Sequence, residues 1–136
     1  MRISGYASRF GERDAGGDIV RPGAFAASLL GTSRTLPMLS DHQRPVGRWT
    51  RAREDATGLW VEGEVNDPAL ARLIRAGKVS GLSIGYRTRR SRGPRGAREL
   101  LSLDLREVSV VAFPMLGSAR ITSFDRHQTQ PQGALA

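Results

Sequence analysis

The chain has 136 residues, which fits a single domain able to bury about two thirds of its unfolded surface. Cysteine is absent, so disulfides, thiolate nucleophiles and cysteine-bound zinc are excluded, and neither His42 nor His127 has another ligand at metal-binding spacing. No metal or cofactor is therefore expected. The net charge of +8 rests almost wholly on arginine, with Lys78 the only lysine, so carboxylates and phosphates are the partners to consider. No apolar run reaches membrane-spanning length and residues 1–10 do not resemble a signal peptide, so we expect no membrane partner.

Short strands are predicted in the first half of the chain. The turn sequence Asp55-Ala56-Thr57-Gly58 separates two runs that alternate like strands, which predicts an antiparallel hairpin. A Gly- and Asp-rich loop is expected over 11–22, and a short helix over 23–30. The strands themselves are expected over 1–10, 36–39, 46–54 and 59–65.

A helix over 68–76 is the most clearly signalled element. Asp67 is a suitable N-cap residue, Pro68 fits the first turn, and Gly77 ends the apolar stripe. This helix leads directly into a strand predicted over 79–87.

The remaining elements complete a fold that is mainly β. A long apolar strand is expected over 100–113, where Pro114 stops it. Residues 1–126 are expected to form the domain, and 127–136, rich in Gln, Pro and Gly, a disordered tail. The fold class expected is mainly β with peripheral helices (α+β), arranged as a small closed β-barrel.

Ser83 stands between two glycines in Gly81-Leu82-Ser83-Ile84-Gly85. The two-residue period of a strand places Gly81, Ser83 and Gly85 on one face, and Leu82 and Ile84 on the other. The glycines would leave space around the Ser83 hydroxyl, as expected for an exposed nucleophile. Alternatively, they mark a β-bulge or a close backbone approach, and Ser83 has no chemical role.

Glu107 is expected on the buried face of the strand over 100–113. The two-residue period groups it with three residues that mark this face as the core side: Leu101, Leu103 and Leu105. A buried carboxylate must be paired, hydrogen-bonded or protonated. An arginine partner would make the pair purely structural. His42 would make it catalytic, because the carboxylate would orient an imidazole that takes the Ser83 proton and returns it to a leaving amine.

Residues 87–98 predict a flexible basic loop. Such a loop is either solvated surface or a binding site for an acidic peptide or a nucleic acid. No aromatic residue lies among them to stack on bases, which does not favour nucleic acid. The six arginines of this segment are Arg87, Arg89, Arg90, Arg92, Arg95 and Arg98.

The chain order of His42, Ser83 and Glu107 excludes the simplest motif match. In an α/β-hydrolase the G-x-S-x-G turn precedes both the acid and the histidine. Here only His127 follows Ser83, next to the expected tail.

Five segments in this order resemble the serine proteases that mature the proheads of tailed phages and of phage-derived gene-transfer particles. The resemblance runs over nearly the whole chain. The segments are Gly5-Tyr6-Ala7, Asp18-Ile19-Val20-Arg21-Pro22-Gly23-Ala24-Phe25, Leu39-Ser40-Asp41-His42 with Pro45-Val46-Gly47, Gly81-Leu82-Ser83-Ile84-Gly85-Tyr86, and Leu105-Arg106-Glu107-Val108-Ser109-Val110-Val111 followed by Pro114-Met115.

The resemblance implies an endopeptidase that cleaves the major capsid protein and scaffold segments, and also itself. It would work inside assembling proheads, in the cytoplasm of the bacterial host, and could form a homo-oligomer. The implied fold is similar to that of the herpesvirus capsid maturation protease, a β-barrel wrapped by helices.

The resemblance places the nucleophile on Ser83 and the base on His42. The third member falls on Glu107, where the herpesvirus enzymes have a second histidine. A catalytic His127 would instead leave Glu107 in a structural pair. Oxyanion donors are expected among the backbone amides of 115–120 by analogy of fold.

Two other classes of protein stay open. A catalytically idle capsid- or scaffold-binding protein on the same fold would tolerate changes at Ser83 and His42. A nucleic-acid-binding barrel would lose affinity steeply with salt. Neither class accounts for His42, Ser83 and Glu107 in one chain.

Overall fold

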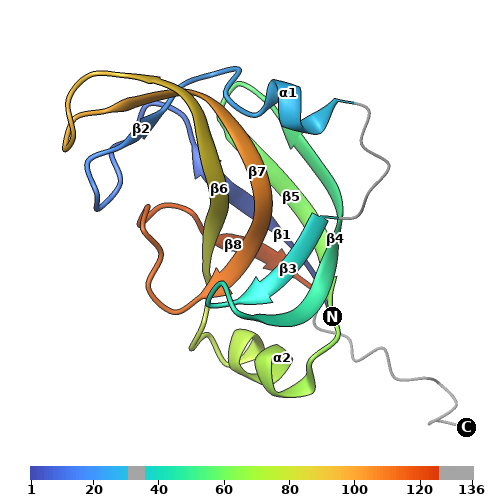
Figure 1. Ribbon diagram of the computed structural model, residues 1–136. Helices are drawn as coiled ribbons and strands as arrows, with labels where there is room; N and C mark the ends of the chain where they lie inside the picture. Colours follow the sequence, from blue (N-terminus) through green and yellow to red (C-terminus); the bar gives the residue numbers. More distant parts are fainter. Residues whose placement is uncertain (31–35, 126–136) are drawn as a thin grey trace, which may run out of the picture.

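The computed structural model describes residues 1–30 and 36–125. These residues form one strongly curved sheet with two helices (Figure 1). In chain order the elements are β1 (Arg2–Arg9), β2 (Ile19–Val20), α1 (Ala26–Leu29), β3 (Leu36–Ser40), β4 (Arg44–Glu54), β5 (Gly58–Val65), α2 (Pro68–Arg75), β6 (Gly81–Arg92), β7 (Glu99–Val111) and β8 (Ile121–Phe124). The mainly β class predicted from the sequence is confirmed.

The sheet is not closed, so the predicted closed barrel is wrong. Its hydrogen-bonded order is β2-β7-β3-β4-β5-β1-β8, and β6 pairs with β7 outside this path. Among the described residues, the start of β6 meets the start of β8 at one isolated bridge, between Gly81 and Arg120. Two hydrogen bonds flank it, from the Leu82 N–H to the Ala119 carbonyl and from the Ile121 N–H to the Ser80 carbonyl. The physical reason is the shortness of β8, whose four residues form a ladder with β1 and none with β6 in the described part of the chain.

β7 is the strand that organises the sheet. It pairs antiparallel with β6 along its whole length, and parallel with both β2 and β3. In Figure 1, β6 and β7 curve together over one side of the molecule. Side chains near the end of β7 therefore neighbour β6 on one side and β3 on the other.

The hydrophobic core lies inside the curve of the sheet. Trp49 is buried there, and its indole N–H donates to the Val108 carbonyl at 3.0 Å. Each fully buried large side chain stabilises the fold by about 1.5–3 kcal/mol. The largest apolar ones are Phe25, Met38, Leu59, Leu82, Leu100, Leu103, Val46, Val61, Val108 and Val110.

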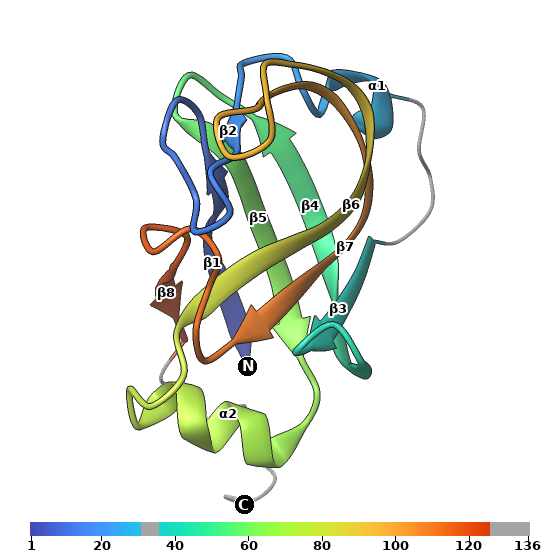
Figure 2. The same cartoon turned by 60° about the vertical axis from the view of Figure 1, so that its left-hand side comes forward.

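Helix α2 confirms its prediction, ending one residue earlier than expected. The Asp67 carboxylate accepts a hydrogen bond from the Leu70 N–H at 2.9 Å, and Leu70 and Ile74 are buried. Gly77 has a φ of 74°, a conformation that glycine adopts at no steric cost. Helices α1 and α2 lie at opposite ends of the molecule (Figure 2), and the chain enters β6 soon after α2.

The basic segment forms a hairpin, so the predicted flexible loop is wrong. β6 runs as far as Arg92 and β7 starts at Glu99, which leaves only 93–98 as the turn. Hydrogen bonds from Arg92 and Arg21 hold the pKa of the Glu99 carboxyl at about 2, and Arg98 pairs with Asp18 at 3.0 Å. These ion pairs tie the turn end of the hairpin to Asp18 and Arg21, the residues on either side of β2.

Some predictions lie outside the described residues. These are the disordered tail over 127–136, the domain end at 126, and His127. Within 1–30 and 36–125, no helix is long and apolar enough to cross a membrane.

Candidate active site

Ser83 lies in β6 and is nine-tenths buried. Its neighbour Leu82 is fully buried in the core, so the alternation of the strand turns Ser83 toward the outer face of the sheet. The Cα partner of Ser83 on β7 is Ser109. Within the described residues, the Ser83 hydroxyl forms no hydrogen bond.

The two glycines beside Ser83 make room for other groups, not for the Ser83 hydroxyl. A Cβ on Gly85 would collide with the carboxylate of Glu107. A Cβ on Gly81 would come within 2.7 Å of both Pro114 and the Val111 carbonyl. Other groups therefore approach both glycines closely, and at Gly85 the approaching group is itself a predicted site residue. This packing does not test the predicted role of Ser83.

His42 lies in the tight turn between β3 and β4. Asp41 and His42 have φ values of 49° and 62°, in the left-handed region that costs a non-glycine residue roughly 1–2 kcal/mol. Two hydrogen bonds to β7 hold the turn: the Asp41 N–H donates to the Val110 carbonyl at 3.2 Å, and the His42 N–H donates to the Ser109 hydroxyl at 2.8 Å. The turn is thus fixed over the end of β7, with the His42 side chain exposed.

Glu107 lies on the outer face of β7, not on the buried face predicted from the sequence. Gly85 pairs with Glu107 and Tyr86 with Leu105, so Arg106 is an extra residue on β7. Such a bulge reverses the alternation, which leaves Leu103 and Leu105 in the core and turns Glu107 outward. Its side chain is still only 12% exposed, because Gly85 and the His42 turn enclose it.

The structure brings His42 and Glu107 together. Nδ1 of His42 lies 2.6 Å from Oε2 of Glu107, and the other carboxylate oxygen, Oε1, accepts a hydrogen bond from the Ser109 hydroxyl at 2.9 Å. An ionised carboxylate can only accept, so Nδ1 carries the proton and the neutral ring keeps a lone pair on Nε2. That lone pair is what a general base needs.

The pairing of Glu107 with an arginine, which would have made it purely structural, is not what the structure shows. Among the described residues, the Glu107 carboxylate contacts the side chains of His42 and Ser109, and no arginine pairs with it. The nearby Arg106 pairs instead with Asp104, at 3.0 Å.

Ser109 belongs to this cluster and was not identified from the sequence. It is fully buried and touches both His42 and Glu107. In the sequence, Ser109 is a single hydroxyl within the apolar run Val108-Ser109-Val110-Val111. Such a residue is also expected wherever a strand turns every second side chain away from the core, so the pattern does not indicate a role for it.

A small cavity of about 90 Å³ adjoins β6 at Ser83. The end of β1, the loop before β2 and the loop after β7 also line it. Met115 and Leu116, in the last of these, come from the segment expected to supply oxyanion donors. Tyr86 also lines it, and burial, together with the Asp18 carboxylate, raises the pKa of its phenol. Space for a small side chain or a leaving group thus lies beside the Ser83 strand.

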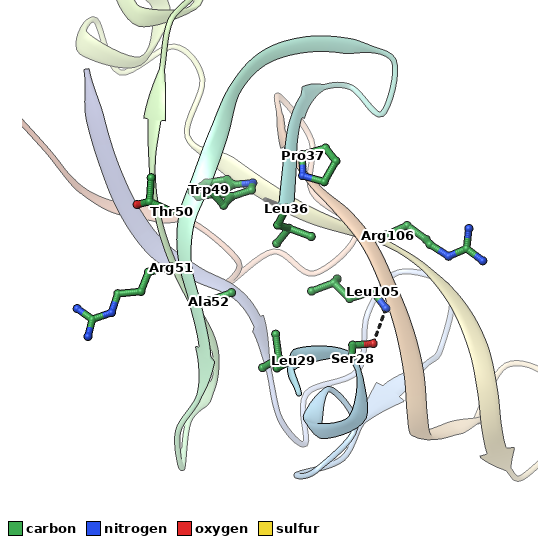
Figure 3. A pocket seen from close by; sticks show the side chains of 10 residues that line it. All are labelled: Ser28, Leu29, Leu36, Pro37, Trp49, Thr50, Arg51, Ala52, Leu105 and Arg106. Carbon is green, nitrogen blue, oxygen red and sulfur yellow. Dashed lines mark hydrogen bonds between the residues drawn. The ribbon is translucent and has the colours of Figure 1, made fainter. Parts of the chain in front are cut away.

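A larger cavity of about 410 Å³ lies between α1, β3, β4 and β7 (Figure 3). Leu29, Leu36 and Leu105 form its apolar lining, while the side chains of Arg51 and Arg106 point away from it. None of His42, Ser83 and Glu107 lines this cavity. Cavity size alone therefore does not locate the candidate chemistry.

No group of three or more His, Cys, Asp or Glu residues that could hold a metal ion occurs in 1–30 and 36–125.

Comparisons of sequence identify relatives of this chain. Residues 1–132 match the family model described as Caudovirus prohead serine protease. The prohead protease of Enterobacteria phage HK97 is 34% identical over 141 residues, which cover 93% of this chain and 63% of that protein. The prohead protease of Escherichia phage T5 is 31% identical over 123 residues, covering 84% and 58%. The chain thus spans less than two thirds of the length of these curated relatives.

Comparisons of structure identify herpesvirus proteases. A crystal structure of KSHV protease in complex with a hexapeptide phosphonate inhibitor has a TM-score of 0.64 at 16% identity, covering 91% of this chain and 65% of that one. A room-temperature structure of Kaposi's sarcoma-associated herpesvirus protease in complex with an allosteric inhibitor has a TM-score of 0.55 at 16% identity, covering 97% and 83%. The predicted similarity to the herpesvirus protease fold is confirmed.

Proposed function

Since this chain belongs to the family of caudovirus prohead serine proteases, we propose that it is a serine endopeptidase that cleaves capsid or scaffold protein as a prohead matures. Family membership supports the reaction type. The roles of single residues are supported by geometry in this chain.

In this proposal Ser83 is the nucleophile, His42 the general base and Glu107 the residue that orients His42. The observation that carries it is the 2.6 Å contact between His42 Nδ1 and Glu107 Oε2, which leaves Nε2 of the imidazole free to accept a proton. The Cα register that pairs Ser83 with Ser109, whose hydroxyl holds the His42 turn, brings the nucleophile to the same end of β7.

The chemistry proceeds in two halves. The Ser83 hydroxyl attacks the scissile carbonyl while its proton passes to Nε2 of His42, and backbone amides of 115–120 stabilise the oxyanion. His42 then gives that proton to the leaving amine, which leaves an acyl ester on Ser83. Water then attacks the ester while His42 takes one of its protons, and His42 returns that proton to the Ser83 oxygen as the acid product leaves. The free enzyme need not show a Ser83–His42 hydrogen bond, because such contacts tighten on substrate binding.

The proposed substrates are the major capsid protein and scaffold segments, inside proheads assembling in the bacterial host. The names of the matched relatives, both prohead proteases of phages, support this setting. Self-cleavage within the tail over 127–136 and formation of a homo-oligomer are further parts of the proposal.

The arginines of β6 are proposed to dock acidic segments of these substrates. Arg87, Arg89 and Arg90 are exposed, form no ion pair within the described residues, and lie on the strand that carries Ser83. At about 3.3 Å per residue, an extended substrate would pass from Ser83 to these side chains within four to seven residues.

Co-expression of the chain with the capsid and scaffold proteins of its own particle tests the proposal. Intact mass should show truncated capsid or scaffold with the wild-type chain and full-length proteins with Ser83→Ala. The matched control is Ser80→Ala, since the Ser80 hydroxyl accepts a hydrogen bond from Arg120 at 3.0 Å and has no proposed role in chemistry. Processing that survives Ser83→Ala and disappears in Ser80→Ala would contradict the proposal.

A further inference from the structure

Ser109 is a buried polar residue whose hydroxyl touches only members of the candidate site. Its side chain has no solvent exposure, which makes an unsatisfied hydroxyl costly at this position. The hydroxyl both accepts and donates: it accepts from the His42 N–H at 2.8 Å and donates to Glu107 Oε1 at 2.9 Å.

These two bonds close a ring of contacts. It runs from the His42 backbone to the Ser109 hydroxyl, then through the Glu107 carboxylate to His42 Nδ1, and back along the His42 side chain. A single hydroxyl therefore fixes both the backbone position of His42 and the orientation of the Glu107 carboxylate.

Each half of the ring opposes a specific displacement. The bond to Oε1 holds the carboxylate so that Oε2 faces the imidazole. This bond is needed because Gly85, which the carboxylate lies against, has no side chain to restrict its movement. The bond to the His42 N–H holds a residue whose φ of 62° is unfavourable for histidine. Without the hydroxyl, both the strained turn and the carboxylate are freer to move.

We propose that Ser109 is a positioning residue that holds the His42–Glu107 pair in its reactive geometry. This inference rests on the proposed function of that pair. The role needs a group that donates and accepts at once, which a serine or threonine hydroxyl does and a methyl group does not.

The test compares Ser109→Thr with Ser109→Val, which have nearly the same shape and differ in the hydroxyl. Cleavage of a fluorogenic peptide containing the mapped scissile site is measured for both, with Ser109→Ala added in case the larger side chains do not fit. We expect kcat to fall about 10- to 100-fold in Ser109→Val and Ser109→Ala, with KM little changed, because a catalytic group displaced by about 1 Å costs up to about 100-fold. Ser109→Thr should recover most of the lost kcat.

A second readout does not depend on cleavage. The proton that His42 Nδ1 shares with Glu107 should give a downfield ¹H resonance, assigned by its loss in His42→Ala. This resonance should persist in Ser109→Thr and shift upfield or broaden in Ser109→Val and Ser109→Ala.

The two readouts separate failure of this inference from failure of the proposed function. If no peptide is cleaved by the wild type but the resonance depends on the hydroxyl, the proposed activity fails and the positioning role stands. Unchanged kcat and an unchanged resonance in Ser109→Val and Ser109→Ala would overturn the inference. So would a lower melting temperature alone, which marks a merely structural hydroxyl.

Discussion

Gly85 leaves room for the side chain of a proposed site residue because it has none of its own. The Glu107 carboxylate occupies the space in which a Cβ of residue 85 would lie. Gly85→Ala should therefore push the carboxylate away from His42 and lower kcat by about 10- to 100-fold, since it displaces an orienting group. Peptide cleavage and thermal unfolding of the variant measure this.

Gly16→Ala is the matched control for Gly85→Ala. A Cβ at Gly16 would meet its nearest neighbours at 3.5 Å, an ordinary contact, so kcat and melting temperature should stay at wild-type values. Equal activity of the two alanine variants would show that Glu107 moves without consequence.

From the backbone conformation of His42 we predict that two variants at this position differ in stability although both are inactive. Its φ of 62° suits glycine better than alanine, so His42→Gly should unfold with a free energy about 1 kcal/mol higher than His42→Ala. Both variants should lack cleavage, because neither has an imidazole. Urea unfolding measures the difference, and a His42→Gly protein no more stable than His42→Ala would show that the turn relaxes when the ring is removed.

At the scale of elements, Glu99 ties down the β6–β7 hairpin at its turn end. The pKa of this carboxyl is lowered from 4.5 to about 2 by hydrogen bonds from Arg92 and Arg21. A lowered folded-state pKa contributes stability that is present above about pH 4.5 and is lost as the pH falls toward 2. Glu99→Gln should therefore melt below the wild type at pH 7, with the two curves converging near pH 2.

Thermal melts from pH 2 to pH 7 test the role of Glu99. Glu64→Gln is the control, since the exposed Glu64 carboxylate forms no ion pair in the described part of the chain and its loss should leave the pH profile unchanged. A constant offset between Glu99→Gln and the wild type at every pH would rule out the ion pairs as the cause.

The arginines of β6 should affect substrate binding and not turnover. Replacing Arg87, Arg89 and Arg90 together by glutamine should raise KM for an acidic substrate several-fold and weaken its salt dependence, with kcat unchanged, because exposed charges act mainly on encounter. Kinetics at two salt concentrations measure this effect.

A second triple variant controls for net charge. Arg48, Arg51 and Arg53 are equally exposed but lie on β4, so replacing them by glutamine removes the same charge from another strand. A similar rise in KM in both triple variants would assign the effect to net charge, and a fall in kcat would place the β6 arginines at the reacting bond.

Sequence reasoning succeeded where one element carries its own signal. Helix α2 has a cap, a first-turn proline and a terminal glycine, so its limits could be predicted closely. It failed for strands that exist because of their neighbours. β2 has two residues, too few to show a period, and is defined by its pairing with β7. The four residues of β8 mix apolar and polar side chains, and this strand is defined by its pairing with β1.

For the candidate site, residue types could be predicted but faces could not. His42 and Glu107 do meet, yet Glu107 reaches His42 from the outer face, because a bulge at Arg106 reverses the alternation. A bulge leaves no mark in a run of leucines and charges. The role inferred for Ser109 was invisible for a related reason. It depends on a hydrogen bond from the backbone of His42, which is distant in the chain, and on a hydrogen bond to Glu107, whose face the bulge decides.

On the scale of the whole molecule, the gap between β6 and β8 is where the sheet should open most easily. Only one bridge and adjacent backbone hydrogen bonds join the two strands, whereas β6 and β7 share a long ladder. Native-state hydrogen exchange should therefore be faster at Leu82 and Ile121, whose N–H groups bond across the gap, than in the ladder between β4 and β5 in the middle of the sheet. Equal protection at the two places would show a sheet that behaves as closed.

The long span of chain between the members of the site has a consequence for the life of the protein in the cell. Glu107 follows His42 by 65 residues and Ser109 follows it by 67. During synthesis, at about 5–20 residues per second, the histidine leaves the ribosome well before the strand that anchors it exists. A nascent or truncated chain would therefore carry the base without its support. The proposed peptidase would stay dormant until the strand that carries Glu107 and Ser109 has been made and has folded, and structural proteins made in the same cell would be spared from partly synthesised copies.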